Sequence, residues 1–137
     1  MRITALLCDH AEVAEGKLFI NGGGWTVIGP GPMPTALALV FEVPWDRANT
    51  RIRFQIRLLD EDGHPVLVPG ANGPGPVEIG GDLEVGRPPG LAPGSDLSAP
   101  MAIPVPPLAL PPGRYLWHLT AEGAEPRQLA FAVRGDG

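Results

Sequence analysis

Apolar and polar residues alternate along most of the chain, and no stretch of about 12 residues has the 3.6-residue period of an amphipathic helix. The clearest alternation is in residues 50–60, TRIRFQIRLLD, where Arg and Gln separate the apolar residues. Residues 77–85, VEIGGDLEV, repeat it with acidic residues between the apolar ones. Both stretches predict half-buried antiparallel strands, and the basic outer face of one is expected to pair with the acidic outer face of the other.

Further strands follow from three other stretches. Residues 36–43, ALALVFEV, are apolar on both faces except for Glu42, which predicts a central strand that is covered on both sides or lies at an interface. Residues 115–121 and 128–134 predict a hairpin. Residues 98–110 also alternate, but their prolines confine them to the edge of a sheet.

Stretches rich in Pro and Gly separate the predicted strands and are expected to be loops: residues 29–34, 69–76 and 87–96. The stretch LPPGRY, residues 110–115, resembles the turn that enters a late strand of many immunoglobulin-like domains, with Tyr115 as the corner tyrosine. We therefore predict an all-β, single-domain antiparallel β-sandwich over residues 1–134, immunoglobulin-like or jelly-roll-like, with about 8–9 strands. Residues 135–137 are expected to be a frayed C-terminal tail.

Composition narrows the class of protein further. The 137 residues include 19 Gly and 18 Pro, but 44% are hydrophobic, which favours an ordered chain with one core. A net charge of -5 argues against a nucleic-acid partner. There is no apolar run of the ~20 residues that a membrane span needs, and ITALLC is too short for a signal peptide. Together with a single cysteine, these features predict a cytoplasmic protein that does not bind membranes.

The stretch with the most candidate chemistry is LLCDHAEVAEGKLFINGGGW, residues 6–25. In a strand that ends near His10, the side chains of Cys8 and His10 share one face and Asp9 lies on the other. A nucleophilic Cys–His pair needs direct contact and usually a third orienting group, and a metal site needs paired ligands that the chain lacks. Cys8 is therefore expected to be a buried thiol, and we assign no catalytic, metal-binding or cofactor-binding residue.

The remaining polar residues of this stretch have a structural interpretation. Asp9 and Glu12 have the spacing of a capping box, and Gly16 suits the end of a single helical turn. The following NGGGW lacks the spacing of a phosphate loop. Three consecutive glycines are more typical of a bend at which another backbone or a large ring approaches the chain closely. Trp25 is the expected ring.

One cluster of loop residues is a candidate for ligand or partner contacts. If the sheet meanders, the loop PWDRANT, residues 44–50, lies at the same pole as the turn after His10. The candidate contact residues are then Asp9, His10, Trp25, Trp45, Asp46 and Arg47. The structural alternative for the loop is a tryptophan lid over the core with an ion-paired turn.

Three stretches together, LLCDHAEVAEGKLFINGGGW, ALALVFEVPWDR and LPPGRYLWHL, resemble an uncharacterised family of small bacterial, largely actinobacterial proteins. Its members carry an N-terminal motif of the type GKLYxxGGGW. The resemblance implies a cytoplasmic β-sandwich and transfers no activity. Our leading hypothesis is a non-enzymatic β-sandwich that acts through protein contacts, as a homo-oligomer or as part of an assembly. A small-ligand or carbohydrate-binding module that uses the loop tryptophans is the alternative, and an enzyme is the least favoured.

Overall fold

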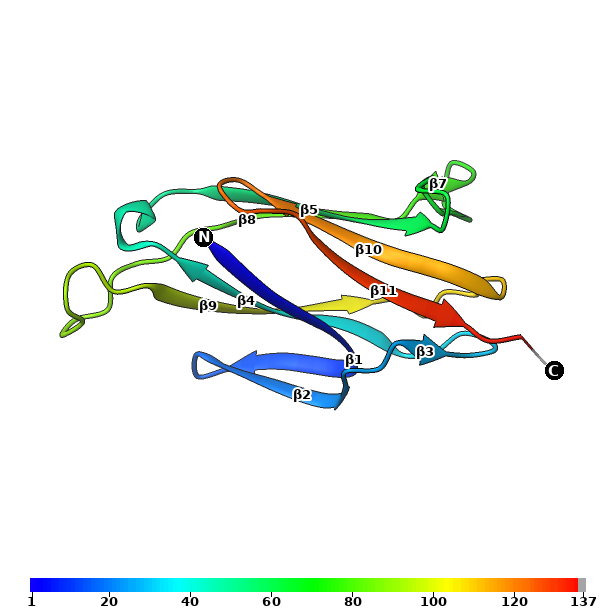
Figure 1. Cartoon of the computed structure of the whole chain (residues 1–137), viewed down its shortest axis with the longest axis horizontal. Helices are drawn as coiled ribbons and strands as arrows, with labels where there is room; N and C mark the ends of the chain where they lie inside the picture. Colours follow the sequence, from blue (N-terminus) through cyan, green and yellow to red (C-terminus); the bar gives the residue numbers. More distant parts are fainter. Residues whose placement is uncertain (136–137) are drawn as a thin grey trace.

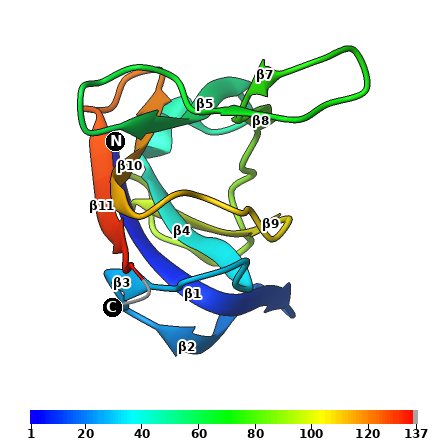
Figure 2. The ribbon, with the colours of Figure 1, turned by 90° about the vertical axis from the view of Figure 1, so that its right-hand side faces the viewer.

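The computed structural model describes residues 1–135, which form two facing sheets and one small ribbon (Figures 1 and 2). The first sheet has the order β2-β1-β4-β9, with the bounds Lys17–Gly23, Arg2–Ala14, Thr35–Val43 and Leu97–Val105. The second has the order β3-β11-β10-β5-β8, with the bounds Val27–Ile28, Arg127–Val133, Gly113–Ala121, Ile52–Asp60 and Glu78–Leu83. The ribbon pairs β6 (Leu67–Val68) with β7 (Gly75–Pro76), and one 3-10 turn, η1, spans Trp45–Arg47.

The predicted all-β antiparallel sandwich is confirmed. The two-residue strands β3 and β7 were not predicted, because so short a segment shows no alternation; β7 lies inside the predicted loop 69–76. Residues 136–137 of the predicted tail lie outside the described part of the chain. Within residues 1–135, no helix is long and apolar enough to cross a membrane.

The strand order favours the immunoglobulin-like form of the prediction over the jelly roll. Strands β1, β4 and β9 are neighbours in one sheet, and β11, β10 and β5 are neighbours in the other, with β8 added beside β5. This is the order of an immunoglobulin-type sandwich, with β2 as an additional edge strand. The Tyr115 hydroxyl donates a 2.6 Å hydrogen bond to the Pro111 carbonyl, four residues upstream. The predicted tyrosine corner is therefore present at the start of β10.

The core lies between the two sheets and is built by the predicted alternating residues. Alternate residues of β5 are buried: Ile52, Phe54, Ile56 and Leu58. On β10 the inward side chains are those of Tyr115, Trp117 and Leu119, and Trp117 is 1% exposed. Because the pattern has a period of two, β5 and β10 each present an apolar face to the core and a mainly polar face outward.

The central strand β4 is buried on both of its faces, as its sequence predicts. Its inward residues belong to the main core: Leu37, Leu39, Phe41 and Val43. Its outward residues Ala36 and Ala38 belong to a second cluster with Cys8 and Ala11. Leu6, Leu18 and Ala102 pack against this second cluster. The outer face of the first sheet thus carries its own small apolar layer.

Candidate functional site

The predicted cluster of Asp9 and His10 with the 44–50 loop does not form. Strand β1 runs antiparallel to β4, with Arg2 opposite Glu42 and Cys8 opposite Ala36. The loop after β4 therefore lies at the N-terminal end of β1, whereas Asp9 lies seven residues along it. At about 3.3 Å per residue, the two groups are roughly 20 Å apart. The meander assumption was wrong, because β4 pairs with β1 rather than with β2, after the chain has passed through β3 in the other sheet.

Asp9 and Trp25 are the two predicted contact residues that the structure brings together. The Trp25 indole N–H donates to the Asp9 carboxylate at 3.1 Å. The Trp25 ring lies edge-on to Phe131, with ring centroids 6.2 Å apart. His10 is exposed and lies opposite Asn21 on β2. The contacts of Trp25 with Asp9 and Phe131 anchor the segment after β2 to the core. They leave little of the indole edge for a ligand.

Trp45, Asp46 and Arg47 form η1 at the other end of β1, and two arginines hold this turn. The Arg87 guanidinium lies 4.6 Å from the centroid of the Trp45 ring, and its Nη2 donates to the Trp45 carbonyl at 2.7 Å. Arg47 donates to the backbone carbonyl of Glu122 at 2.7 Å. The predicted tryptophan lid is confirmed, since Trp45 packs partly buried on the core. Arg47 donates to a backbone carbonyl of the β10–β11 connection, so the predicted ion pair within the turn is replaced by this hydrogen bond.

The predicted helical turn in residues 9–16 is wrong, because β1 continues to Ala14. Ala14 lies opposite Lys17, and the two residues between them have φ values of 52° (Glu15) and 73° (Gly16). Two consecutive left-handed residues make a type I′ turn, which matches the twist of paired strands. The hairpin pairs the backbone of residues 10–14 with β2. A single helical turn would leave these backbone groups unpaired.

The glycine run makes room for Asp9, Leu6 and Ile20 rather than for Trp25. Gly22 has a φ of 60°, and a Cβ atom there would collide with the Asp9 carboxylate. A Cβ atom at Gly23 would lie 2.8 Å from Ile20 and 3.1 Å from Leu6. The bend at these glycines therefore brings Ile20 to the same side of the sheet as Leu6, and the predicted role of Trp25 as the large ring is corrected.

Beyond Cys8, strand β1 pairs only with β2, because its pairing with β4 covers Arg2 to Cys8. We call residues 9–23 the arm; Figure 2 shows β2 outside β1 at the margin of the first sheet. The arm exposes three large apolar side chains: Val13 (43% exposed), Phe19 (51%) and Ile20 (39%). A single exposed apolar residue is ordinary on a protein surface, whereas these three lie on one edge hairpin.

Cys8, at the base of the arm, is a structural thiol. Its side chain is fully buried, and its Sγ donates a 3.5 Å hydrogen bond to the Ala36 carbonyl. Burial, reinforced by the charge of Asp9, raises the pKa of the thiol above its ordinary value. A raised pKa lowers the fraction of reactive thiolate, as expected of a buried thiol.

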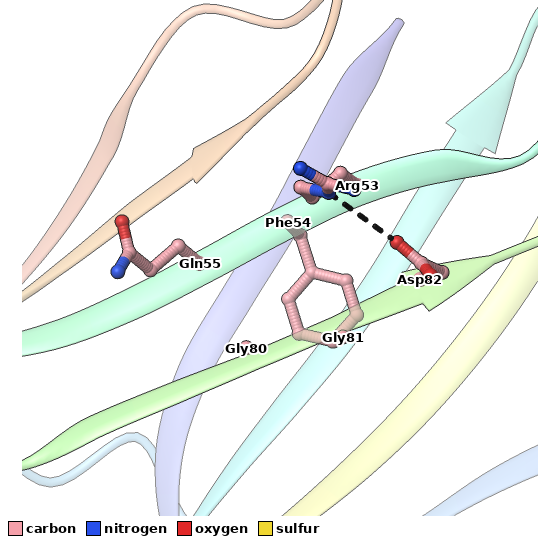
Figure 3. A pocket seen from close by; sticks show the side chains of 6 residues that line it. All are labelled: Arg53, Phe54, Gln55, Gly80, Gly81 and Asp82. Atoms are coloured by element: carbon pink, nitrogen blue, oxygen red, sulfur yellow. Dashed lines mark ion pairs between the residues drawn. The ribbon is translucent and has the colours of Figure 1, made fainter.

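The outer face of the second sheet holds a hollow of about 390 Å³ over β5 and β8 (Figure 3). It is lined by Arg53, Phe54, Gln55, Gly80, Gly81 and Asp82. Asp82 lies 3.8 Å from Arg53 and 3.9 Å from Arg51, so the predicted pairing of basic and acidic strands is present. A Cβ atom at Gly81 would press on the Phe54 ring at 3.1 Å. Gly81 therefore faces the core with Phe54, whereas Gly80 lies opposite Gln55 on the outer face and has no side chain to fill the hollow. The charges that line the hollow already have partners.

A surface turn gathers the side chains of Asp60, Asp62 and His64, whose potential ligand atoms lie within 4.8 Å of one another. The Asp60 carboxylate accepts the backbone N–H groups of Asp62 and His64 at 2.9 and 3.0 Å. An aspartate that caps the backbone of its own turn explains this arrangement.

The chain belongs to a family of unknown function, DUF6941, whose model matches residues 3–134. No curated protein matches the chain. The family match confirms the predicted resemblance to an uncharacterised family, and it assigns no activity to any residue.

Proposed function

We propose that this member of the DUF6941 family is a non-enzymatic β-sandwich that acts through protein contacts made by the arm. The observation that carries the proposal is the arm itself. Residues 9–23 extend past the last residue that β4 pairs with, and they expose Val13, Phe19 and Ile20 on a hairpin with a free edge. A free edge and exposed apolar side chains on one element are the features by which sheets recognise other chains.

The state of the titratable side chains supports a non-enzymatic role. Besides Arg2, whose pKa is raised by its hydrogen-bonded ion pair with Glu42, the described residues with a shifted pKa are Cys8 and Tyr115, and both pKa values are raised chiefly by burial. Cys8 bonds to a backbone carbonyl and Tyr115 forms the corner of β10. Perturbed groups at active sites usually face a cleft beside a partner that activates them. Here both shifts belong to groups that hold the sandwich together.

The alternative, a small-ligand or carbohydrate-binding module, is less well supported. A platform for a sugar needs an aromatic face or edge that is free to receive it. The Trp25 indole N–H is taken by Asp9, and Arg87 lies over the Trp45 ring. Neither tryptophan lines the hollow over β5 and β8 or four further surface hollows, which measure about 250 to 340 Å³.

The proposal is tested by photo-crosslinking in the cells that produce the protein. A photoreactive amino acid replaces Phe19, and a matched variant carries it at Leu67, which is 62% exposed and lies on β6 away from the arm. We expect position 19 to yield a discrete adduct with an identifiable protein, another copy of the chain included, and position 67 to yield none. Equal adducts from both positions, or none from position 19, would overturn the proposal.

A further inference from the structure

The free edge of β2 differs from the outer edges of β9, β3 and β8, the other strands that end the two large sheets in the described part of the chain. The opposite edge of the same sheet, β9, contains Pro100 and Pro104, which have no N–H to offer. In the second sheet, β3 is two residues long, and β8 carries Glu78 and Asp82. Prolines, short strands and charges all discourage the addition of a strand. Strand β2 has seven residues, no proline and one charge, on Lys17.

The hairpin geometry determines which backbone groups of β2 are free. In a two-residue hairpin the residues that flank the turn, here Ala14 and Lys17, direct their N–H and C=O groups at each other. Every second residue along β2 also directs its N–H and C=O groups at β1, and Phe19 is one of these residues. Leu18 and Ile20 direct their N–H and C=O groups away from β1. The free edge therefore presents the donor and acceptor row that another antiparallel strand requires.

We infer that the occupant of this edge is β2 of a second copy of the chain, paired antiparallel about a two-fold axis at Phe19. This inference rests on the proposed function and names its partner. Leu18 then lies opposite Ile20 of the partner subunit, and each such pair exchanges both N–H···O bonds. The two Phe19 rings lie opposite each other between these pairs, at a Cα separation of about 4.5 Å. The two first sheets become one continuous sheet.

The sequence of β2 is complementary to itself in this register, and this favours a second copy over an unrelated strand. Apolar Leu18 meets apolar Ile20 in both directions, and the exposed Phe19 gains an aromatic partner. The single charge, Lys17, lies opposite the neutral Asn21 of the partner subunit, so no like charges meet on neighbouring strands. A two-fold contact of this kind uses the same surface twice and closes at a dimer.

The register is tested with a charge exchange at Phe19, because the axis places this residue opposite its own copy. Wild-type protein is expected to have twice the mass of one chain by light scattering at micromolar concentration and above. Phe19→Lys and Phe19→Glu each bring like charges together and are expected to raise the dimer Kd at least tenfold. An equimolar mixture of the two variants is expected to restore the dimer, because Lys then faces Glu. Leu67→Lys, a matched change at an exposed apolar residue, should leave the dimer unchanged.

A disulfide trap provides a second measurement that does not depend on affinity. In a Cys8→Ala background, Phe19→Cys is expected to form an intermolecular disulfide under mild oxidation several times faster than Ile20→Cys, whose two copies lie apart in this register. Because Phe19 is half-exposed, its replacement should leave the fold intact, and a thermal melt of each variant checks this.

Several results would overturn the inference. These are a wild-type monomer at every concentration, a dimer that persists in both charge variants, a mixture that stays monomeric although its variants are folded, or faster crosslinking at position 20 than at position 19. A monomer that still gives a discrete adduct with a different protein from position 19 would overturn this inference alone. A monomer with no adduct would overturn the proposed function as well.

Discussion

The two hairpins of the molecule, β1–β2 and β10–β11, have similar alternating sequences but opposite surroundings. The β10–β11 hairpin lies inside the second sheet and buries Tyr115, Trp117, Leu119, Phe131 and Val133. The β1–β2 hairpin lies at the edge of the first sheet. Past Cys8, β1 pairs with β2 on one side and with no strand on the other. The difference shows that alternation predicts a strand, whereas the neighbouring strands decide whether its apolar face stabilises the core or remains available for a partner.

The largest expected effect comes from removing Trp117, the most buried ring of the β10–β11 hairpin. The exposed Phe19 of the β1–β2 hairpin provides the comparison. Trp117→Ala is expected to lower the free energy of unfolding by about 3–5 kcal/mol, because it leaves a cavity between the sheets. Loss of the indole N–H, which has no partner among the described residues, offsets a little of this cost. Chemical denaturation at low protein concentration measures the change.

Phe19→Ala is the matched control for Trp117→Ala, because it also removes one aromatic ring from a hairpin strand. In the monomer it should change the free energy of unfolding by no more than about 0.5 kcal/mol. Similar losses in the two variants would contradict the division into a structural hairpin and a contact hairpin.

The next expected effect concerns the bend at the base of the arm. Gly22→Ala is expected to cost about 1–2 kcal/mol, because the residue has a φ of 60° and its Cβ atom collides with the Asp9 carboxylate. Displacement of Asp9 should also break its hydrogen bond with Trp25, which tryptophan fluorescence reports. Gly16→Ala also has positive φ but open space around its Cβ atom, and it should change stability without the fluorescence change.

The sequence predicted the sandwich, its long strands and the tyrosine corner, because each depends on residues close together in the chain. It did not predict the arm, because Glu15 is unusual in a type I′ turn and the capping-box spacing of Asp9 and Glu12 suggested a helical turn. The contact of Asp9 with Trp25 depends on a bend at Gly22, and the separation of Asp9 from Trp45 depends on the pairing of β4 with β1 rather than with β2. Such non-local choices leave no local periodic signal.

The smallest expected effect tests the corner that begins β10. Tyr115→Phe removes the hydrogen bond to the Pro111 carbonyl and should lower the free energy of unfolding by about 1 kcal/mol at neutral pH. Burial, and then the charges of Asp60 and Glu61, raise the pKa of the Tyr115 phenol above its ordinary value of 10.0. Between the ordinary and the raised pKa the folded state binds more protons than the unfolded state, so this contribution to stability falls as the pH rises.

The phenylalanine variant has no phenol at this position and should lack that part of the alkaline destabilisation. The difference in unfolding free energy between wild type and Tyr115→Phe should therefore shrink once the pH exceeds 10.0. Urea denaturation of both proteins across neutral and alkaline pH gives the comparison, and the arm variant Phe19→Ala serves as the control, because it retains Tyr115 and should lose stability with pH in parallel with wild type. A difference that is constant or grows with pH would mean that the Tyr115 hydroxyl ionises at least as easily in the folded chain as in the unfolded one, and that the corner is not the protected end of a structural hairpin.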